Sequence, residues 1–218
     1  MKEPIKAHPL HPNLVVFDHP LIQHKLTWLR DVETGFRTFR ALLSQIAGLM
    51  VYEVTRAFPS EPVPVRTPLE PTVGTRISAR ITVVPVLRAG LGMAEGVLEV
   101  MPEARVGHLG MFRDERTLQP VHYLSRLPRD LGAGPVILVD PMLATGGSAS
   151  AAASLLKKQG ASDLRMICLV AVPEGVTRMR QDHPDVTIYA AALDRMLDER
   201  GFILPGLGDA GDRLYGTG

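Results

Sequence analysis

The sequence predicts an α/β fold, with a mainly parallel, twisted sheet flanked by helices. Between residues 81 and 190, short apolar runs rich in β-branched residues alternate with helical patterns, the order expected of successive β–α–β units. Two of these runs, 81–86 and 136–139, lead directly into glycine-containing turns that open helices. A length of 218 residues with 45% hydrophobic and 22% charged residues is typical of one globular domain.

Composition excludes several classes of protein. A net charge of +1 provides no general attraction to nucleic acid or anionic lipid. No apolar run reaches the roughly 18 residues of a membrane-spanning helix, and the first residues lack the apolar core of a signal peptide. The single cysteine, Cys168, lies in an apolar run and is expected to be a buried hydrophobe. We therefore expect a soluble, cytoplasmic protein that binds neither membrane nor nucleic acid.

The N-terminal part is predicted to be an arm followed by a long helix. Residues 1–20 are rich in Pro and His, and without a cluster of Cys or carboxylates we expect an extended arm packed on the body rather than a metal site. Helical spacing then predicts a long amphipathic helix over residues 33–58, ended by Pro59 and Pro62. The residues with this spacing are Phe36, Phe39, Leu43, Ile46, Met50 and Val54. Residues 63–80 are predicted to be a strand pair or an extended excursion.

The remaining elements follow from the alternation. Strands are expected over residues 81–86, 105–112, 119–124, 136–139, 164–172 and 186–190. Helices are expected from the turn at 88–92 to about residue 100, from the turn at 144–148 to 159, and over 174–181. We therefore predict one domain, composed of an N-terminal arm and long helix (1–60), an α/β core (61–200) and a glycine-rich C-terminal segment (201–218).

The strongest chemical signal follows the strand 136–139. The strand ends in a carboxylate, Asp140, and a loop of small residues then opens a helix. Gly146 and Gly147 allow close approach of an anion, while Thr145, Ser148 and the helix N-terminus supply donors and positive potential. This pattern predicts a phosphate-binding loop, and the acid before it suits a phosphorylated sugar; a helix capped by Ser148 after a flexible loop is the alternative.

The segment from Asp140 to Ser148 resembles the phosphoribosyl diphosphate (PRPP) motif of type I phosphoribosyltransferases. Most of that superfamily has two adjacent acids before the loop, whereas here the second is Pro141, as in uracil phosphoribosyltransferases. Residues 85–93 are similar to that family's first basic loop, 110–117 to its flexible active-site loop, and 201–213 to its base-binding segment. The resemblance runs from about residue 13 to the end, in order and without a large insertion.

This resemblance implies transfer of the 5-phosphoribosyl group from PRPP to N1 of uracil, giving UMP and diphosphate. Asp140 and Arg113 are the implied catalytic residues, with Arg113 on a loop that closes over bound substrate. The residues implied to bind PRPP are Arg88, Arg113, Asp140, Pro141, Met142, Leu143, Ala144, Thr145, Gly146, Gly147, Ser148 and Asp209. Those implied to bind uracil are Ile203, Gly208, Asp209 and Ala210. Since Pro141 replaces an acid, Mg²⁺ is expected to be held mainly through PRPP.

Two alternatives stay open on the same fold. One is a regulator that binds nucleotide and RNA, which the charge of +1 and the lack of a basic stripe disfavour. The other is a transferase for a different base, such as a purine, which the segment Gly208-Asp209-Ala210 disfavours. A GTP effector and a dimeric or tetrameric assembly also accompany the family. We expect at least a homodimer, because the long helix and the arm before it present much apolar surface.

Overall fold

The computed structural model describes residues 7–113 and 120–217. Its centre is a twisted sheet in the order β1-β2-β12-β11-β9-β5-β7-β8, with β10 beside β11 and β6 beside β5. The strands are β1 (Ala7–His8), β2 (His11–Val16), β5 (Thr82–Leu87), β6 (Arg105–Val106), β7 (His108–Arg113), β8 (Pro120–Arg126), β9 (Val136–Val139), β10 (Met142–Leu143), β11 (Leu164–Ala171) and β12 (Thr187–Leu193). Neighbours from β2 to β7 pair in parallel, and within this sheet, as far as it is described, only the outer pairs β1–β2 and β7–β8 are antiparallel. The predicted mainly parallel α/β sheet is confirmed.

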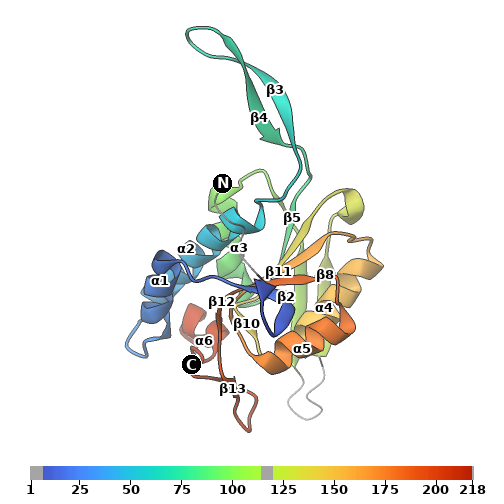
Figure 1. Ribbon diagram of the computed structural model, residues 1–218. Coiled ribbons are helices and arrows are strands. Elements are labelled where there is room, and N and C mark those ends of the chain that lie inside the picture. The colour runs from blue at the N-terminus through green and yellow to red at the C-terminus, as the bar shows by residue number, and fades with distance from the viewer. Residues whose placement is uncertain (1–6, 114–119, 218) are drawn as a thin grey trace.

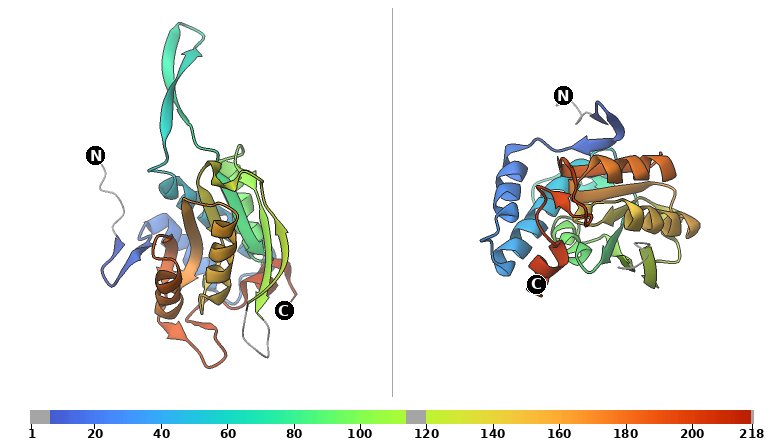
Figure 2. Two further views of the ribbon diagram at one scale, coloured as in Figure 1. Left: turned by 90° about the vertical axis from the view of Figure 1, so that its right-hand side faces the viewer. Right: turned by 90° about the horizontal axis from the view of Figure 1, so that it is seen from below.

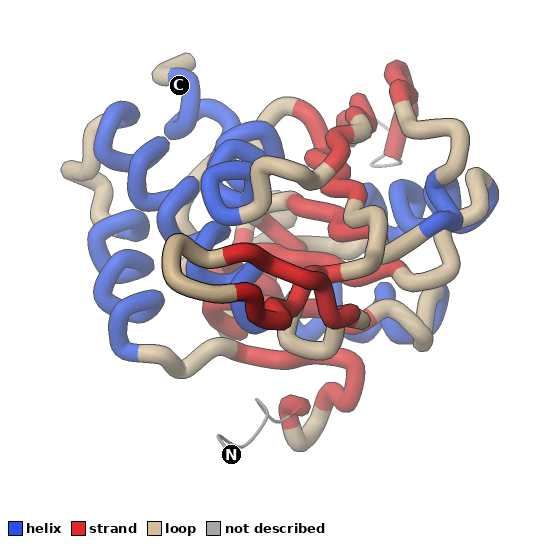
Figure 3. The backbone as a smooth tube through the Cα atoms, turned by 90° about the horizontal axis from the view of Figure 1, so that it is seen from above, coloured by secondary structure: helices blue, strands red, loops and turns tan. Residues whose placement is uncertain are grey.

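Helices cover both faces of the sheet (Figures 1 and 3). On one face lie α1 (Pro20–Arg30), α2 (Phe36–Val54), α3 (Gly90–Val100) and the short α6 (Ala210–Tyr215). On the other lie α4 (Gly147–Lys158) and α5 (Pro173–Asp182). Each strand contributes alternate residues to the two layers, as Val83 and Val84 of β5 do, because successive side chains point to opposite faces.

The predicted N-terminal arm is partly confirmed and partly more regular than expected. It packs on the body as predicted, since β2 adds to the sheet beside β12, with Leu14 opposite Ile188. The helix α1 after it was not predicted. Its signals were Pro20 in the first turn and Ile22, Leu26 and Leu29 along one buried face.

The long helix α2 is shorter than the predicted range of 33–58: it begins at Phe36 and ends at Val54. Gly35 is its N-cap and Thr55 its C-cap, where the Thr55 hydroxyl donates to the Val51 carbonyl at 3.0 Å. Its apolar face is buried within the same chain, among α1, α3, α6 and the sheet. Most of the apolar surface predicted for this helix is therefore covered within the same chain, although Phe36 in its first turn is 54% exposed.

The excursion at 63–80 is a strand pair that projects from the body. Strands β3 (Ser60–Arg66) and β4 (Pro71–Ile77) form an antiparallel hairpin that extends away from the sheet (Figures 1 and 2). At the opposite end of the molecule, β13 (Met196–Leu197) and β14 (Ile203–Leu204) form a small pair just before α6. A single turn of 3₁₀ helix, η1 (Leu131–Ala133), precedes β9.

Within the described residues, no helix combines the length and the apolar character needed to cross a lipid bilayer.

Candidate active site

The site is built on the carboxyl ends of β5 and β9, two neighbouring parallel strands. Val136–Val139 form β9 because four consecutive apolar residues are buried between two layers of helices. Asp140 follows at once, and the backbone continues into β10, which pairs with β11. Since parallel strands end at the same edge, the turn after β5 lies beside Asp140, as predicted for an α/β sheet.

A pocket of about 240 Å³ lies at this edge. Four residues predicted to bind PRPP line it together: Arg88, Asp140, Ser148 and Asp209. Arg88 follows β5, Asp140 follows β9, Ser148 lies in α4 and Asp209 in the C-terminal segment. The fold therefore brings residues up to 121 positions apart, from 88 to 209, to one cavity. The other described lining residues are Val86, Leu87, Ala89, Met111 and Gly211.

Asp140 directly follows the strand and is half-buried at the pocket. Its Oδ1 accepts a hydrogen bond from the Met142 backbone N–H at 3.2 Å. Burial raises the pKa of Asp140 to about 6, and the Met142 hydrogen bond offsets only part of that effect. A raised carboxyl pKa in a polar pocket is typical of a group that meets its partner only when a ligand binds.

Cys168 lies nearby on β11 but is fully buried in the core. Burial, and then the neighbouring Asp140 charge, raise the pKa of its thiol. The prediction that Cys168 is a buried hydrophobe is therefore confirmed.

The predicted phosphate loop leads into α4. Gly146 is the N-cap with φ of 76°, in the left-handed region that favours glycine, and a Cβ there would lie 2.8 Å from the Gly175 carbonyl oxygen. No side chain caps the helix, and its first turn carries no acid. Ser148 lies inside the helix rather than at its N-cap, so the alternative of a Ser148-capped helix is wrong. The first amide groups of α4 can meet an anion.

The earlier part of the loop is held by β11. The Pro141 carbonyl accepts from the Leu169 and Val170 backbone N–H groups at 3.0 and 3.1 Å, and the Leu143 carbonyl from Val172 at 3.2 Å. Pro141 and Leu143 are buried, whereas Met142, Ala144 and Thr145 are partly exposed. This part of the loop therefore fixes the position of Asp140 and of the α4 N-terminus.

Arg88 is exposed at the mouth of the pocket, and its contacts are weak. Its guanidinium is 3.6 Å from Asp212 Oδ1, in a pair that is 57% and 41% exposed, and it lies 5.5 Å from the centre of the Tyr215 ring. A pair this exposed contributes little to stability. Arg88 can therefore exchange Asp212 for an incoming anion at small cost.

The C-terminal segment places one of its predicted ligands in the pocket. Asp209 lines the cavity and is also the N-cap of α6, accepting from the Asp212 N–H at 2.9 Å. Ile203 in β14 and Ala210 in α6 are buried, and Gly208 is exposed with φ of 77°. These three lie on either side of Asp209 in the chain but do not line the same cavity.

Arg113 is the last residue of β7, opposite Pro120 of β8 in register. Its side chain and residues 114–119 lie outside the described part of the chain. The predicted flexible loop therefore begins later than expected, since residues 110–113 are part of β7, and the rest of it is not described.

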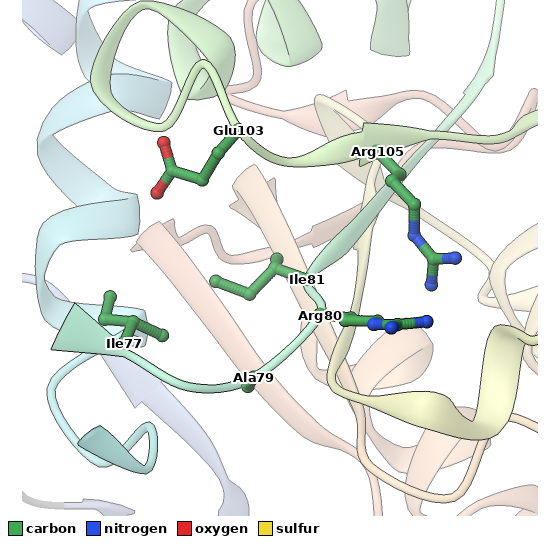
Figure 4. A pocket seen from close by; sticks show the side chains of 6 residues that line it. All are labelled: Ile77, Ala79, Arg80, Ile81, Glu103 and Arg105. Atoms are coloured by element: carbon green, nitrogen blue, oxygen red, sulfur yellow. The ribbon is translucent and has the colours of Figure 1, made fainter. Parts of the chain in front are cut away.

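A larger hollow, of about 340 Å³, lies at the other end of β5, at the base of the projecting hairpin (Figure 4). Arg80 and Arg105 point to the same side of it and both bind Asp130, while Glu103 points to the opposite side. Because ligands of such sheets bind at the carboxyl edge, the smaller pocket is the candidate active site.

Comparison with known proteins decides the family. The family model described as "Uracil phosphoribosyltransferase" matches residues 15–217. The chain belongs to the uracil phosphoribosyltransferase family. The uracil phosphoribosyltransferase of Bacillus pumilus is 57% identical over 203 residues, covering 93% of this chain and 97% of that protein. That of Dictyoglomus thermophilum is 53% identical over 205 residues, covering 94% and 99%.

Solved structures agree with the fold. A protein from Aquifex aeolicus superposes with a TM-score of 0.90 at 38% identity, covering 94% of this chain and 98% of that one. A hypoxanthine-guanine phosphoribosyltransferase of Bacillus anthracis, with a TM-score of 0.50 and 12% identity, shares the fold alone. The predicted family, fold and enzyme class, a pentosyltransferase, are therefore confirmed for this uracil phosphoribosyltransferase.

Two arginines near the site were missed as functional candidates. Arg30 and Arg213 hold the backbone of the C-terminal segment, at Gly206 and Leu207 respectively. Arg213 belongs to the segment that resembles the family, but Arg30 lies in the unpredicted helix α1. The apolar spacing of α1 was the signal that could have placed Arg30.

Proposed function

We propose that the pocket at the carboxyl edge of the sheet is where this uracil phosphoribosyltransferase moves the 5-phosphoribosyl group from PRPP to N1 of uracil. The observation that carries this assignment is the meeting of Arg88, Asp140, Ser148 and Asp209 around one cavity. The whole chain then acts as one phosphoribosyltransferase domain, in which 1–60 supports the core and 201–218 completes the site.

The loop 141–148 and the first turn of α4 receive the 5-phosphate, because no side chain caps the helix and its first turn carries no acid, which leaves its first amides for an anion. Asp140, at the strand end, accepts hydrogen bonds from the ribose hydroxyls. The hydroxyl protons stabilise its ionised form, which burial disfavours in the free enzyme.

In the reaction, the bond from C1 of ribose to the diphosphate oxygen breaks and a bond from C1 to uracil N1 forms, while N1 loses its proton. Negative charge grows on the leaving diphosphate as C1 gains oxocarbenium character. Arg88, at the mouth of the pocket, and Arg113 are assigned to stabilise that charge. The chain needs no covalent nucleophile, and Cys168, although close to Asp140, is fully buried in the core.

The lining of this pocket suits a Mg²⁺ ion that binds together with PRPP. Asp140 and Asp209 are the two acids that line the cavity, and Mg²⁺ is commonly held by one or two carboxylates together with substrate phosphates and water. Across residues 7–113 and 120–217, no group of three or more His, Cys, Asp or Glu side chains is arranged to hold a metal. When bound with PRPP, Mg²⁺ supplies positive charge to the diphosphate.

The direct test is UMP formation from uracil and PRPP, with Mg²⁺ and with a chelator in its place. We expect activity that depends on both substrates and on Mg²⁺, with thymine, cytosine and purines competing poorly against uracil. Preferential use of a purine would overturn the base assignment, and full activity with the chelator would overturn the role of Mg²⁺.

Three further proposals rest on the family. GTP as an effector predicts a change in velocity at subsaturating PRPP when GTP is added, and unchanged velocities would reject it. A homo-oligomer is also proposed, because the projecting hairpin β3–β4 leaves apolar side chains exposed. A cytoplasmic location stays a prediction, which cell fractionation would test.

A further inference from the structure

An ion pair outside the pocket joins three distant parts of the chain. Arg30, the last residue of α1, donates from Nη1 to Asp194 Oδ2 at 2.8 Å and from Nη2 to Asp194 Oδ1 at 2.6 Å. Asp194 directly follows β12, and its side chain is only 5% exposed, against 23% for Arg30. Such a bidentate pair fixes orientation as well as distance.

The third partner of this pair is the backbone of Gly206. Arg30 Nη1 also donates to the Gly206 carbonyl at 2.6 Å, and the Gly206 N–H donates to Asp194 Oδ2 at 3.0 Å. Both polar backbone groups of one buried residue are therefore held by one ion pair. We call this arrangement the Arg30–Asp194 clamp.

Gly206 is the point at which the C-terminal segment turns toward the pocket. Its φ is 65°, and a Cβ at this position would overlap the carbonyl oxygen of Ile203, so the turn admits only glycine. The next three residues after Leu207 are those assigned to the base and to PRPP: Gly208, Asp209 and Ala210. The orientation of the Gly206 peptides thus sets where these residues lie.

A second arginine continues the same support. Arg213 Nη1 donates to the carbonyls of Leu207 and Leu29, both at 2.8 Å, and its guanidinium lies 4.5 Å from the centre of the Phe39 ring. Two arginines therefore attach the C-terminal segment to the end of α1. Arg30 binds the Gly206 carbonyl, and Arg213 binds the carbonyls of both Leu29 and Leu207.

A buried ion pair is a weak source of stability, since the loss of hydration offsets most of the attraction. It is better suited to select one arrangement of the groups that it binds. We propose that Arg30 and Asp194 are positioning residues for uracil: the clamp fixes Gly206 so that the backbone of 207–210 presents its donors and acceptors to the edge of the base. This proposal rests on the proposed assignment of the C-terminal segment to uracil.

The test compares the clamp with a matched pair elsewhere in the chain. Arg165 also makes a two-point contact with an aspartate, Asp163, at 3.1 and 3.3 Å, and donates to one carbonyl, that of Val54, at 2.7 Å. It lies at the start of β11, at the edge of the sheet opposite the pocket. Arg30→Gln and Arg165→Gln therefore remove similar interactions, and only the first removes a contact with the base-binding segment.

We expect Arg30→Gln to raise the KM for uracil at least about tenfold and the KM for PRPP clearly less, because the same segment contributes only Asp209 to PRPP, while kcat changes by no more than about twofold. Arg30→Lys should be intermediate, because an ammonium cannot make the same fork. Asp194→Asn should also raise the uracil KM, and the double variant should be no worse than Arg30→Gln. Arg165→Gln should lower Tm and leave the uracil KM within about twofold of the parent.

Equal effects of Arg30→Gln and Arg165→Gln on the uracil KM would overturn the proposal, since the clamp would then be purely structural. The base assignment is checked separately on the unaltered enzyme, by amide hydrogen exchange with and without UMP. Protection of 203–210 by UMP together with unchanged uracil KM in Arg30→Gln rejects the clamp alone. No protection of 203–210 rejects the base assignment itself.

Discussion

At the scale of single residues, the candidate site depends most on Asp140. The sequence placed an acid at the end of a buried strand, and the structure confirms that position beside Arg88, Ser148 and Asp209 in one pocket. What the sequence could not provide is how far the carboxyl is removed from water, because that depends on β11 and on the loop packed around it. For the same reason Arg30 escaped notice: its partners Asp194 and Gly206 are 164 and 176 positions away.

Replacing Asp140 separates its role in catalysis from its effect on the fold. We expect Asp140→Asn to lower turnover at least about tenfold, because a neutral amide cannot accept as strongly from the ribose hydroxyls or balance developing positive charge. Steady-state kinetics with both substrates varied would measure this. Asp163→Asn, at the opposite edge of the sheet, serves as the control and should keep parental turnover. Parental kinetics in a folded Asp140→Asn enzyme would remove Asp140 from the mechanism.

The raised pKa of Asp140 also predicts a dependence of stability on pH. The folded pKa is about 6 against an ordinary value of 3.8, so the folded state keeps its proton to higher pH than the unfolded state does. The free energy of unfolding therefore falls as pH rises from about 4 to about 6, by up to roughly 3 kcal/mol, and stays lower above that range.

Asp140→Asn lacks this loss, so the variant should be more stable than the parent at pH 8 and about equal to it at pH 4. Urea unfolding at the two pH values, without substrates, would measure the difference. A variant less stable than the parent at pH 8 would contradict the desolvated environment of Asp140.

Arg113 is predicted to act on the leaving diphosphate more than on substrate capture. Arg113→Ala should lower kcat by an amount equivalent to about 2–4 kcal/mol and change the KM for PRPP less, as for an interaction made mainly in the transition state. Arg126→Ala, at the other end of the β7–β8 pair, is the matched control and should leave both unchanged. A raised KM with unchanged kcat would make Arg113 a simple binding contact, and no change in either would leave Arg88 as the main candidate.

At the scale of elements, the sequence predicted best where one segment carries its own pattern. Strand β9 has the predicted bounds, and β5, β11, α4 and α5 differ by a few residues, since their apolar runs and flanking glycines or prolines are local signals. The predicted strand at 105–112 is divided into β6 and β7 around Gly107. Apart from α1, the elements missed are short or depend on partners. In α6, the decisive feature is Asp209 as N-cap, and β13 and β14 exist only as a pair.

The N-terminus of α4 offers a test of the phosphate loop as an element. Gly146→Ala introduces a side chain at φ of 76° and places a Cβ 2.8 Å from the Gly175 carbonyl oxygen, so the loop must shift. We expect a loss of about 1–2 kcal/mol in the free energy of unfolding and a several-fold rise in the KM for PRPP. Denaturant unfolding and steady-state kinetics would measure the two effects.

Gly160→Ala is the matched control at the far end of the same helix. Gly160 also has positive φ, 101°, but a Cβ there has no neighbour closer than 3.8 Å among the atoms that surround it. This variant should lose comparable stability and keep the parental KM for PRPP. If both variants raise that KM equally, the effect belongs to the stability of α4 and the loop has no special role.

At the scale of the whole molecule, the β–α–β order predicted a parallel sheet with helices on both faces, because right-handed crossovers leave few other arrangements. It could not predict which strands lie at the edges, since β2 joins β12 from the other end of the chain. It also predicted an oligomer from the apolar surface of the long helix and of the arm before it, and most of the apolar face of α2 packs inside the same chain.

The projecting hairpin β3–β4 provides a better reason to expect an oligomer. It exposes several apolar side chains along its length: Val65, Leu69, Val73 and Ile77, with Leu69 95% exposed. An isolated two-stranded hairpin is marginally stable in water, so a cover for these side chains is expected. A second copy of the chain is the partner that is always present at the concentration of the protein itself.

We therefore predict a solution mass of at least about 47 kDa, twice the 23.7 kDa of one chain, by light scattering at micromolar concentration. Replacing Leu69 and Val73 together by Glu should shift the mass toward one chain, because two buried carboxylates oppose association. Leu10 and Val32, 77% and 86% exposed but away from the hairpin, provide the control pair, and their replacement by Glu should leave the mass unchanged. A parent enzyme near 24 kDa would reject the oligomer. An oligomer unaffected by the hairpin variant would place its interface elsewhere on the molecule.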